Sequence, residues 1–150
     1  MSVKDILFLI DGYDINVRSY IEILADQELQ PINEMERDLM VHDSCVYARY
    51  ENVIEQPRKL LKLAGYNVKE PQYSGKLTHC CGGPIESIFP KTAHQIGAKR
   101  VKQLKDTKAK SAVLMCPICL ATLKKAAGVE IEVSDISSLL AKVYCDGQFS

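Results

Sequence analysis

The sequence predicts an α/β fold in which helices flank a parallel sheet, and it predicts a single domain over residues 1–150. The main observation is an alternation along the chain of short apolar segments of strand length and longer segments of helical periodicity. Because parallel strands need a long crossover between them, this alternation is typical of a helix-flanked parallel sheet. A length of 150 residues also suits one domain with its own core, and the chain has no internal repeat or Gly/Ser-rich linker.

Five apolar segments predict the strands. They are residues 4–11, 36–44, 65–71, 110–116 and 129–133. The segment 36–44 ends just before Cys45, and the segment 110–116 ends at Cys116. Since ligand sites gather at the carboxyl ends of strands in such sheets, we expect both thiols on one rim, within reach of the turn that carries Cys80 and Cys81.

Helices are predicted between and after these strands. They are residues 15–29, 55–64, 86–106, 117–128 and 134–145. Two of them carry a proline in the first turn and a glycine at or just past the end, which are Pro57 with Gly65 and Pro117 with Gly128. The closing helix has Ser134 or Asp135 as its expected N-cap.

Composition and charge narrow the class of partner. Nineteen basic and nineteen acidic residues cancel, so no broad positive field is present to attract a nucleic-acid backbone. The apolar run at residues 6–10 is too short to span a bilayer and lacks the features of a secretory signal. We therefore expect a cytoplasmic protein with no transmembrane segment, and peripheral membrane attachment through a partner stays open.

Six cysteines are many for a cytoplasmic chain, and they are unevenly spaced. In a reducing compartment, clustered cysteines indicate metal binding or redox chemistry rather than a disulfide scaffold. Five of them form the pattern of one cysteine, a vicinal pair and a CxxC: Cys45, Cys80, Cys81, Cys116 and Cys119. Gly82 and Gly83 follow the pair, and they permit positive φ and a close approach of the backbone to a bulky inorganic group.

The residues alone leave three kinds of site open. Five thiolates exceed the four ligands of a zinc ion, which favours iron and sulfide, although zinc on four of the five remains an alternative. A metal-free thiol–disulfide exchanger using Cys116 and Cys119 is a third hypothesis. Cys145 lies apart, late in the closing helix, and is expected to pack in the core or remain a free thiol. His42 and His79 are close in sequence to candidate ligands and could donate hydrogen bonds to them, although local packing is the plainer interpretation.

The segments HDSCVYARYENVIEQPRKLL, CCGG and CPICLATLKKA together resemble the cysteine-rich CCG domain, over about residues 40–145. That domain occurs in a cysteine-rich subunit of heterodisulfide reductase and in iron–sulfur subunits of glycolate, lactate and glycerol-3-phosphate oxidising complexes. The resemblance implies that the five cysteines bind a non-cubane [4Fe-4S] cluster, with Gly82 completing the CCG motif. It implies an oxidoreductase subunit for electron transfer to, or reduction of, a disulfide or thiol substrate.

The resemblance also implies partners. Members of the family usually carry two copies of the motif, and one is present here, so a second CCG-domain chain is a candidate partner. A ferredoxin-type run of cysteines is absent from these 150 residues, so electrons are expected to arrive from separate ferredoxin-type iron–sulfur and flavin subunits. Pro84 interrupts the glycine-rich segment that often follows the vicinal pair.

Overall fold

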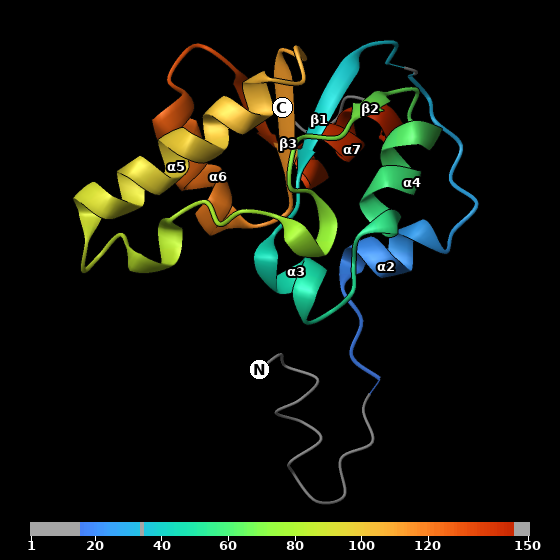
Figure 1. Ribbon diagram of the computed structural model, residues 1–150. Helices are drawn as coiled ribbons and strands as arrows, with labels where there is room; N and C mark the ends of the chain where they lie inside the picture. Colours follow the sequence, from blue (N-terminus) through green and yellow to red (C-terminus); the bar gives the residue numbers. More distant parts are fainter. Residues whose placement is uncertain (1–15, 34, 146–150) are drawn as a thin grey trace, which may run out of the picture.

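The computed structural model describes residues 16–33 and 35–145, in which four strands form one parallel sheet (Figure 1). The strands are β1 (Asp38–His42), β2 (Asn67–Lys69), β3 (Ser111–Leu114) and β4 (Glu132–Asp135). Their order in the sheet is β2-β1-β3-β4, and every neighbouring pair is parallel. The predicted α/β class is therefore confirmed, while the strand expected at residues 4–11 lies outside the described residues.

Helices cover both faces of this sheet (Figure 1). They are α2 (Tyr20–Ala25), α3 (Cys45–Arg49), α4 (Glu55–Leu63), α5 (Pro90–Lys105), α6 (Pro117–Ala127) and α7 (Ile136–Tyr144), with short 3₁₀ turns η1 (Gly75–Leu77) and η2 (Gly83–Ile85). Within the described ranges, no helix is both long enough and apolar enough to cross a membrane.

Alternate residues of the central strands pack into two separate hydrophobic cores, because successive side chains of a strand point to opposite faces of the sheet. Leu39 and Val41 pack with the buried sides of α2, α4 and α7. Met40 and Leu114 pack on the other face with α5 and α6. Strands β1 and β3 are thus covered on both sides, which explains why their sequences are continuous apolar runs rather than alternating ones.

Local capping signals fix several helix ends as expected. Asp135 is the N-cap of α7, and its carboxylate accepts a 2.8 Å hydrogen bond from the Ser137 amide. Pro117 begins α6, and Gly128 ends it at a φ of 56°. Gly65, at a φ of 83°, follows Ala64, the C-cap of α4. These signals act within one helical turn, so the sequence alone reveals them.

Other boundaries differ from the predicted ones. Helix α2 is shorter than residues 15–29, because Ser19 and Glu22 form a capping box that starts it at Tyr20. Helix α5 starts at Pro90 rather than at 86, since a residue before proline is pushed away from helical geometry. Strand β4 covers Glu132–Asp135 rather than 129–133, in register with β3. Helix α3, which begins at Cys45, was not predicted at all.

The sheet order creates a switch point between β1 and β3. The chain leaves β1 toward β2 on one side, and later returns to β3 on the other side of β1. The connections after β1 and β3 therefore lead away in opposite directions, and the carboxyl ends of these two strands are where ligands bind in folds of this kind. His42 and Leu114, paired in register, mark that end of the two strands.

Candidate metal centre

Three separate segments bring cysteines to the carboxyl ends of β1 and β3. Cys45 is the first residue of α3, three residues beyond the end of β1. Cys116 is the N-cap of α6, two residues beyond the end of β3. Cys80 and Cys81 lie in the turn that leads into η2. The expected meeting of the vicinal pair with the strand-end thiols is what the structure shows.

The five side chains form a continuous series of neighbours. Cys81 and Cys45 lie close enough to Cys80 to raise the pKa of its thiol by charge repulsion. Cys81 and Cys116 affect the pKa of Cys119 in the same way. All five are free thiols, with Cys81 and Cys119 buried and the other three half-buried. The sulfurs of Cys81 and Cys119 and a ring nitrogen of His42 lie within 4.8 Å of one another. Soft donors of this kind and number match what a thiolate-bound metal centre requires.

Cys81 and Cys119 share a proton at the buried end of this series. A hydrogen bond from Cys119 lowers the pKa of Cys81, and His42 and the Gly83 amide add to that effect against the opposing effect of burial. The same contact and burial raise the pKa of Cys119. Of the two, Cys81 is therefore the one whose thiolate form these contacts favour. Because a metal takes up thiolates, binding at this end would release the Cys119 proton.

The two glycines after the vicinal pair direct backbone N–H groups at its sulfurs. The Gly82 amide lies 3.3 Å from Cys80 Sγ, and the Gly83 amide lies 3.4 Å from Cys81 Sγ. A Cβ on Gly82 would stand 2.4 Å from the Ala93 carbonyl oxygen of α5, and one on Gly83 would stand 2.3 Å from Ile118 Cγ2 of α6. The close approach that these glycines permit is thus to two helices, which bring the turn against the start of α6.

We expect Gly82→Ala to lower the free energy of unfolding by about 2–5 kcal/mol, from an overpacked backbone contact and a left-handed φ of 91°. The matched control is Gly75→Ala. Gly75 also has a positive φ, 58°, but its Cβ would meet only Ile54 at 3.6 Å, so that variant should lose about 1–2 kcal/mol. Urea denaturation of both variants measures the difference. Equal losses would show that the Gly82 turn has room to relax away from α5.

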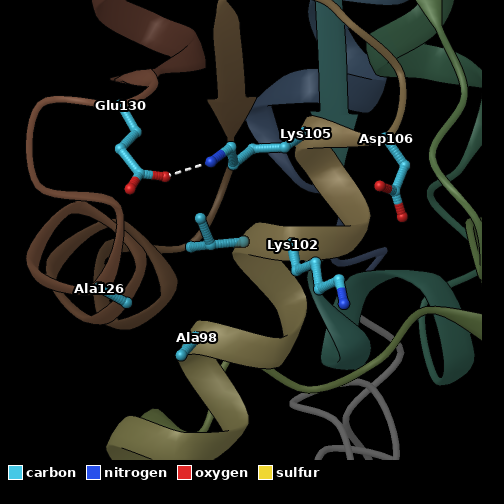
Figure 2. A pocket seen from close by; sticks show the side chains of 7 residues that line it. Ala98, Lys102, Lys105, Asp106, Ala126 and Glu130 are labelled. Carbon is cyan, nitrogen blue, oxygen red and sulfur yellow. Dashed lines mark hydrogen bonds and ion pairs between the residues drawn. The ribbon is translucent and has the colours of Figure 1, made fainter.

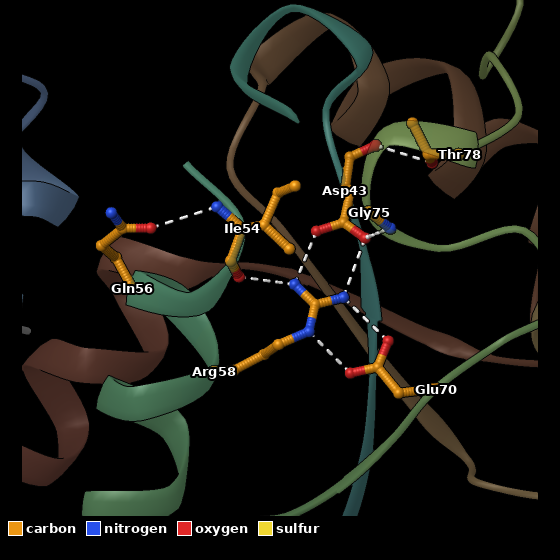
Figure 3. Close-up of polar contacts among 7 residues, drawn as sticks. All are labelled: Asp43, Ile54, Gln56, Arg58, Glu70, Gly75 and Thr78. Carbon is orange, nitrogen blue, oxygen red and sulfur yellow. Dashed lines mark hydrogen bonds and ion pairs between the residues drawn. The ribbon is translucent and has the colours of Figure 1, made fainter. Parts of the chain in front are cut away.

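A buried ion-pair network holds the cysteine-bearing loop to the sheet (Figure 3). Arg58 of α4 donates to both oxygens of Asp43, at 2.8 and 2.9 Å, and to both oxygens of Glu70, at 2.7 and 2.8 Å. Burial opposes its charge, yet the hydrogen bonds with Asp43 and Glu70 raise the pKa of Arg58. Asp43 in turn accepts from the Gly75 amide, and its carbonyl accepts from Thr78 Oγ1. The loop before Cys80 is therefore anchored at the end of β1.

A second buried arginine, Arg100, lies behind the cysteines. Like Arg58, it was not predicted from the sequence as part of the site. Arg100 of α5 donates from Nε to His42 Nδ1 at 3.1 Å. Its position in the sequence did carry a signal, because Ala93, Gly97, Val101 and Leu104 form the buried stripe of α5 and Arg100 falls on that stripe. A charged residue at a core position is uncommon unless it has specific partners.

A groove of about 510 Å³ lies between the far ends of α5 and α6 (Figure 2). It is lined by Ala98, Val101, Lys102, Lys105, Asp106, Ala126 and Glu130, and Lys105 pairs with Glu130 across it. Ala126 is roughly 13 Å along α6 from Pro117, at 1.5 Å per residue. The groove is therefore separate from the cysteines at the start of α6.

Cys145, the C-cap of α7, is half-buried and does not belong to the core.

Comparison with known families identifies the class of protein. The CCG family, described as a cysteine-rich domain, matches residues 39–124. That region is more than half of the chain, and it contains the five gathered cysteines. The chain belongs to this family of cysteine-rich domains, which confirms the resemblance seen in its motifs.

Curated proteins of similar sequence carry iron–sulfur or heterodisulfide reductase names. An uncharacterized iron-sulfur protein of Methanocaldococcus jannaschii is 29% identical, over 85% of this chain and 27% of that protein. The probable iron-sulfur-binding oxidoreductase FadF of Bacillus subtilis is 28% identical, over 87% of this chain and 20% of that protein. One subunit of the dihydromethanophenazine:CoB–CoM heterodisulfide reductase of Methanosarcina barkeri is 31% identical, over 75% of this chain and 28% of that protein. The chain thus spans less than a third of the length of each of these relatives.

Proposed function

We propose that this chain binds one iron–sulfur cluster through Cys45, Cys80, Cys81, Cys116 and Cys119 and serves as a redox subunit. The observation that carries the proposal is that the buried sulfurs of Cys81 and Cys119 lie within 4.8 Å of each other, with the free thiols of Cys45, Cys80 and Cys116 near them at the ends of β1 and β3. The relatives named as iron–sulfur proteins support it. In this proposal residues 1–150 act as one unit of CCG type, with the ligands between about residues 40 and 145.

The number of thiols favours a cluster over a single ion. Zinc takes four ligands in structural sites, whereas several irons can use five cysteines. A zinc site would use four of the five thiols and leave one without a role. The vicinal pair Cys80 and Cys81 can supply two sulfurs to a single metal centre. By analogy with the family, we infer a non-cubane [4Fe-4S] cluster, with a zinc-bearing structural module as the alternative.

When bound, such a cluster would supply electrons for the reductive cleavage of a disulfide substrate, which takes up two electrons and two protons and gives two thiols. The protein sets the direction of access to it. Cys81 and Cys119 are buried, whereas Cys45, Cys80 and Cys116 are half-buried. A substrate or an electron donor would therefore approach from the side of the half-buried cysteines.

Exposed apolar side chains next to those cysteines support a partner protein at this face. Val46 follows Cys45 on α3, and Ile118 is two residues after Cys116 on α6; both are at least half exposed. Leu77 of η1 is 73% exposed. Apolar side chains gathered near one site are typical of a protein interface. We infer that redox-complex subunits of ferredoxin or flavin type, or a second CCG-domain chain, dock here.

The test is metal and acid-labile sulfide analysis of the full chain purified without air, with electron paramagnetic resonance on the same sample. The proposal predicts iron and sulfide in equal amounts and a brown protein whose signal changes on reduction with dithionite. It also predicts that an organic disulfide reoxidises two one-electron-reduced clusters per disulfide, and that two protons are taken up and two thiols form. A colourless chain with one zinc and no sulfide would contradict the proposal and support the structural module.

A further inference from the structure

Arg100 is a fully buried cation that lies behind the candidate metal centre. Its guanidinium donates to His42 Nδ1, to the Gln72 carbonyl at 2.8 Å and to Gln103 Oε1 at 3.1 Å. All three partners are neutral acceptors, and Nη2 is buried without a hydrogen-bond partner within the ranges that the structure describes. In the part of the chain that the structure describes, Arg100 makes no ion pair with a carboxylate. Burial lowers the pKa of Arg100 to about 10, so it remains charged at neutral pH.

A buried charge without a partner costs several kcal/mol, so its presence calls for a compensating negative charge. Asp43 supplies some of it at a distance, but that carboxylate is already held by Arg58. The cysteines at this end of the sheet are the other candidates for that charge, and the sulfurs of Cys81 and Cys119 lie within 4.8 Å of a ring nitrogen of His42. A cation placed here suits a site that gathers several thiolates.

The contact between Arg100 and His42 fixes which nitrogen of the histidine carries the proton. A guanidinium can only donate, so His42 Nδ1 must be the acceptor and must lack a proton. An imidazole whose Nδ1 accepts a hydrogen bond is neutral and carries its one N–H on Nε2. That nitrogen is buried and has no hydrogen-bond partner among the described residues, and a nitrogen of the same ring lies within 4.8 Å of the sulfurs of Cys81 and Cys119. His42 is thereby set to donate to Cys81.

Gln103, one turn after Arg100 on α5, orients the second histidine, His79. Because Gln103 Oε1 accepts from Arg100, its NH₂ group is turned toward His79 Nδ1, 2.9 Å away. His79, stacked on Tyr73 with ring centroids 4.1 Å apart, precedes Cys80 directly. Two residues of one helix thus orient both histidines that lie next to the cysteines.

We propose that Arg100 is a positioning residue that raises the reduction potential of the bound cluster, through the His42 N–H aimed at Cys81 and through its own buried positive charge. The inference depends on the proposed function. Net charge and hydrogen bonds to sulfur are two of the factors that set the potential of an iron–sulfur cluster. Reduction adds a negative charge, so a nearby cation and an N–H donor both stabilise the reduced form.

The test compares Arg100→Gln with Arg100→Lys in the iron-loaded full chain, by a dithionite titration followed with electron paramagnetic resonance. Arg100→Gln should shift the ratio of reduced to oxidised cluster at least tenfold toward the oxidised form, which is about 59 mV for a one-electron couple. Arg100→Lys keeps the charge and should lose less than half of that. Arg37→Gln is the control, because Arg37 is half-exposed and precedes β1, roughly 16 Å along the strand from its His42 end.

An iron-loaded Arg100→Gln chain with the wild-type potential would overturn this inference and leave the proposed function intact. Absence of iron from the wild-type chain would overturn the proposed function itself. If Arg100→Gln does not fold, His42→Leu removes the N–H donor at a site of similar volume and should lower the potential in the same direction. Nitrogen-15 NMR of the wild-type chain gives an independent result. We expect the Nε2–H form of His42, and the Nδ1–H form would contradict the hydrogen bond from Arg100 on which the inference depends.

Discussion

Replacing Cys81 by alanine is expected to remove most of the iron and sulfide from the chain. Cys81 is the buried middle member of the series, next to Cys80 in the chain and hydrogen-bonded to Cys119. It is also the sulfur toward which the Gly83 amide and His42 are directed. Its loss would separate the half-buried Cys45 and Cys80 from Cys116 and Cys119, so no remaining set would surround one centre. Iron and labile sulfide per chain, with the visible spectrum, measure the effect.

Cys145→Ala is the matched control for this experiment. Cys145 ends α7, which starts at the carboxyl end of β4 and runs back for nine residues, away from the rim that bears the other thiols. This variant should keep the iron, the sulfide and the spectrum of the wild type. If Cys81→Ala also kept them while remaining folded by circular dichroism, the assignment of five cysteine ligands would be wrong.

Arg58→Met is expected to reduce the free energy of unfolding by about 3–5 kcal/mol. The substitution leaves Asp43 fully buried with no cation beside it, and removing one partner of a buried pair is costly for that reason. Because Asp43 also accepts from the Gly75 amide, we expect faster hydrogen exchange in the loop that leads to Cys80. Urea denaturation of the metal-free chain and hydrogen exchange at Gly75 are the two measurements.

Arg18→Met provides the comparison with a surface pair. Arg18 pairs with Asp26 at the ends of α2, where both side chains are at least a third exposed. Exposed pairs of this kind contribute about 0–1 kcal/mol, so the variant should be nearly as stable as the wild type. Equal stability of the two arginine variants would mean that the network in Figure 3 does not hold the loop.

Much of the fold follows from short-range signals in the sequence. Pro117 and Gly128 delimit α6, and Asp135 caps α7, because each acts within a turn of its own helix. The apolar runs predicted β1 and β3 within two residues at each end, since strands buried on both faces have continuous apolar sequences. The cysteine pattern indicated which segments meet, and the parallel sheet explains why they meet at the strand ends.

The structural features that were not predicted from the sequence depend on contacts between residues that lie far apart in the chain. Arg58 and Asp43 are 15 residues apart, and Arg100 and His42 are 58 apart, so neither contact leaves a local pattern. Helix α3 has only five residues, which is too short for a recognisable period. The glycines after the vicinal pair were predicted to take positive φ and to approach an inorganic group. Of the two, only Gly82 has a positive φ, and the neighbours they approach are Ala93 and Ile118, in helices that only the folded chain brings there.

The most direct test of the central claim is a crystal structure of the iron-loaded chain, with anomalous scattering measured at the iron edge. The account predicts iron peaks within bonding distance of the sulfurs of Cys80 and Cys81 and of the other three cysteines of the series, all in a single centre beside the ends of β1 and β3. Iron bound with the neighbouring sulfurs of Cys80 and Cys81 turned away from it would contradict the account.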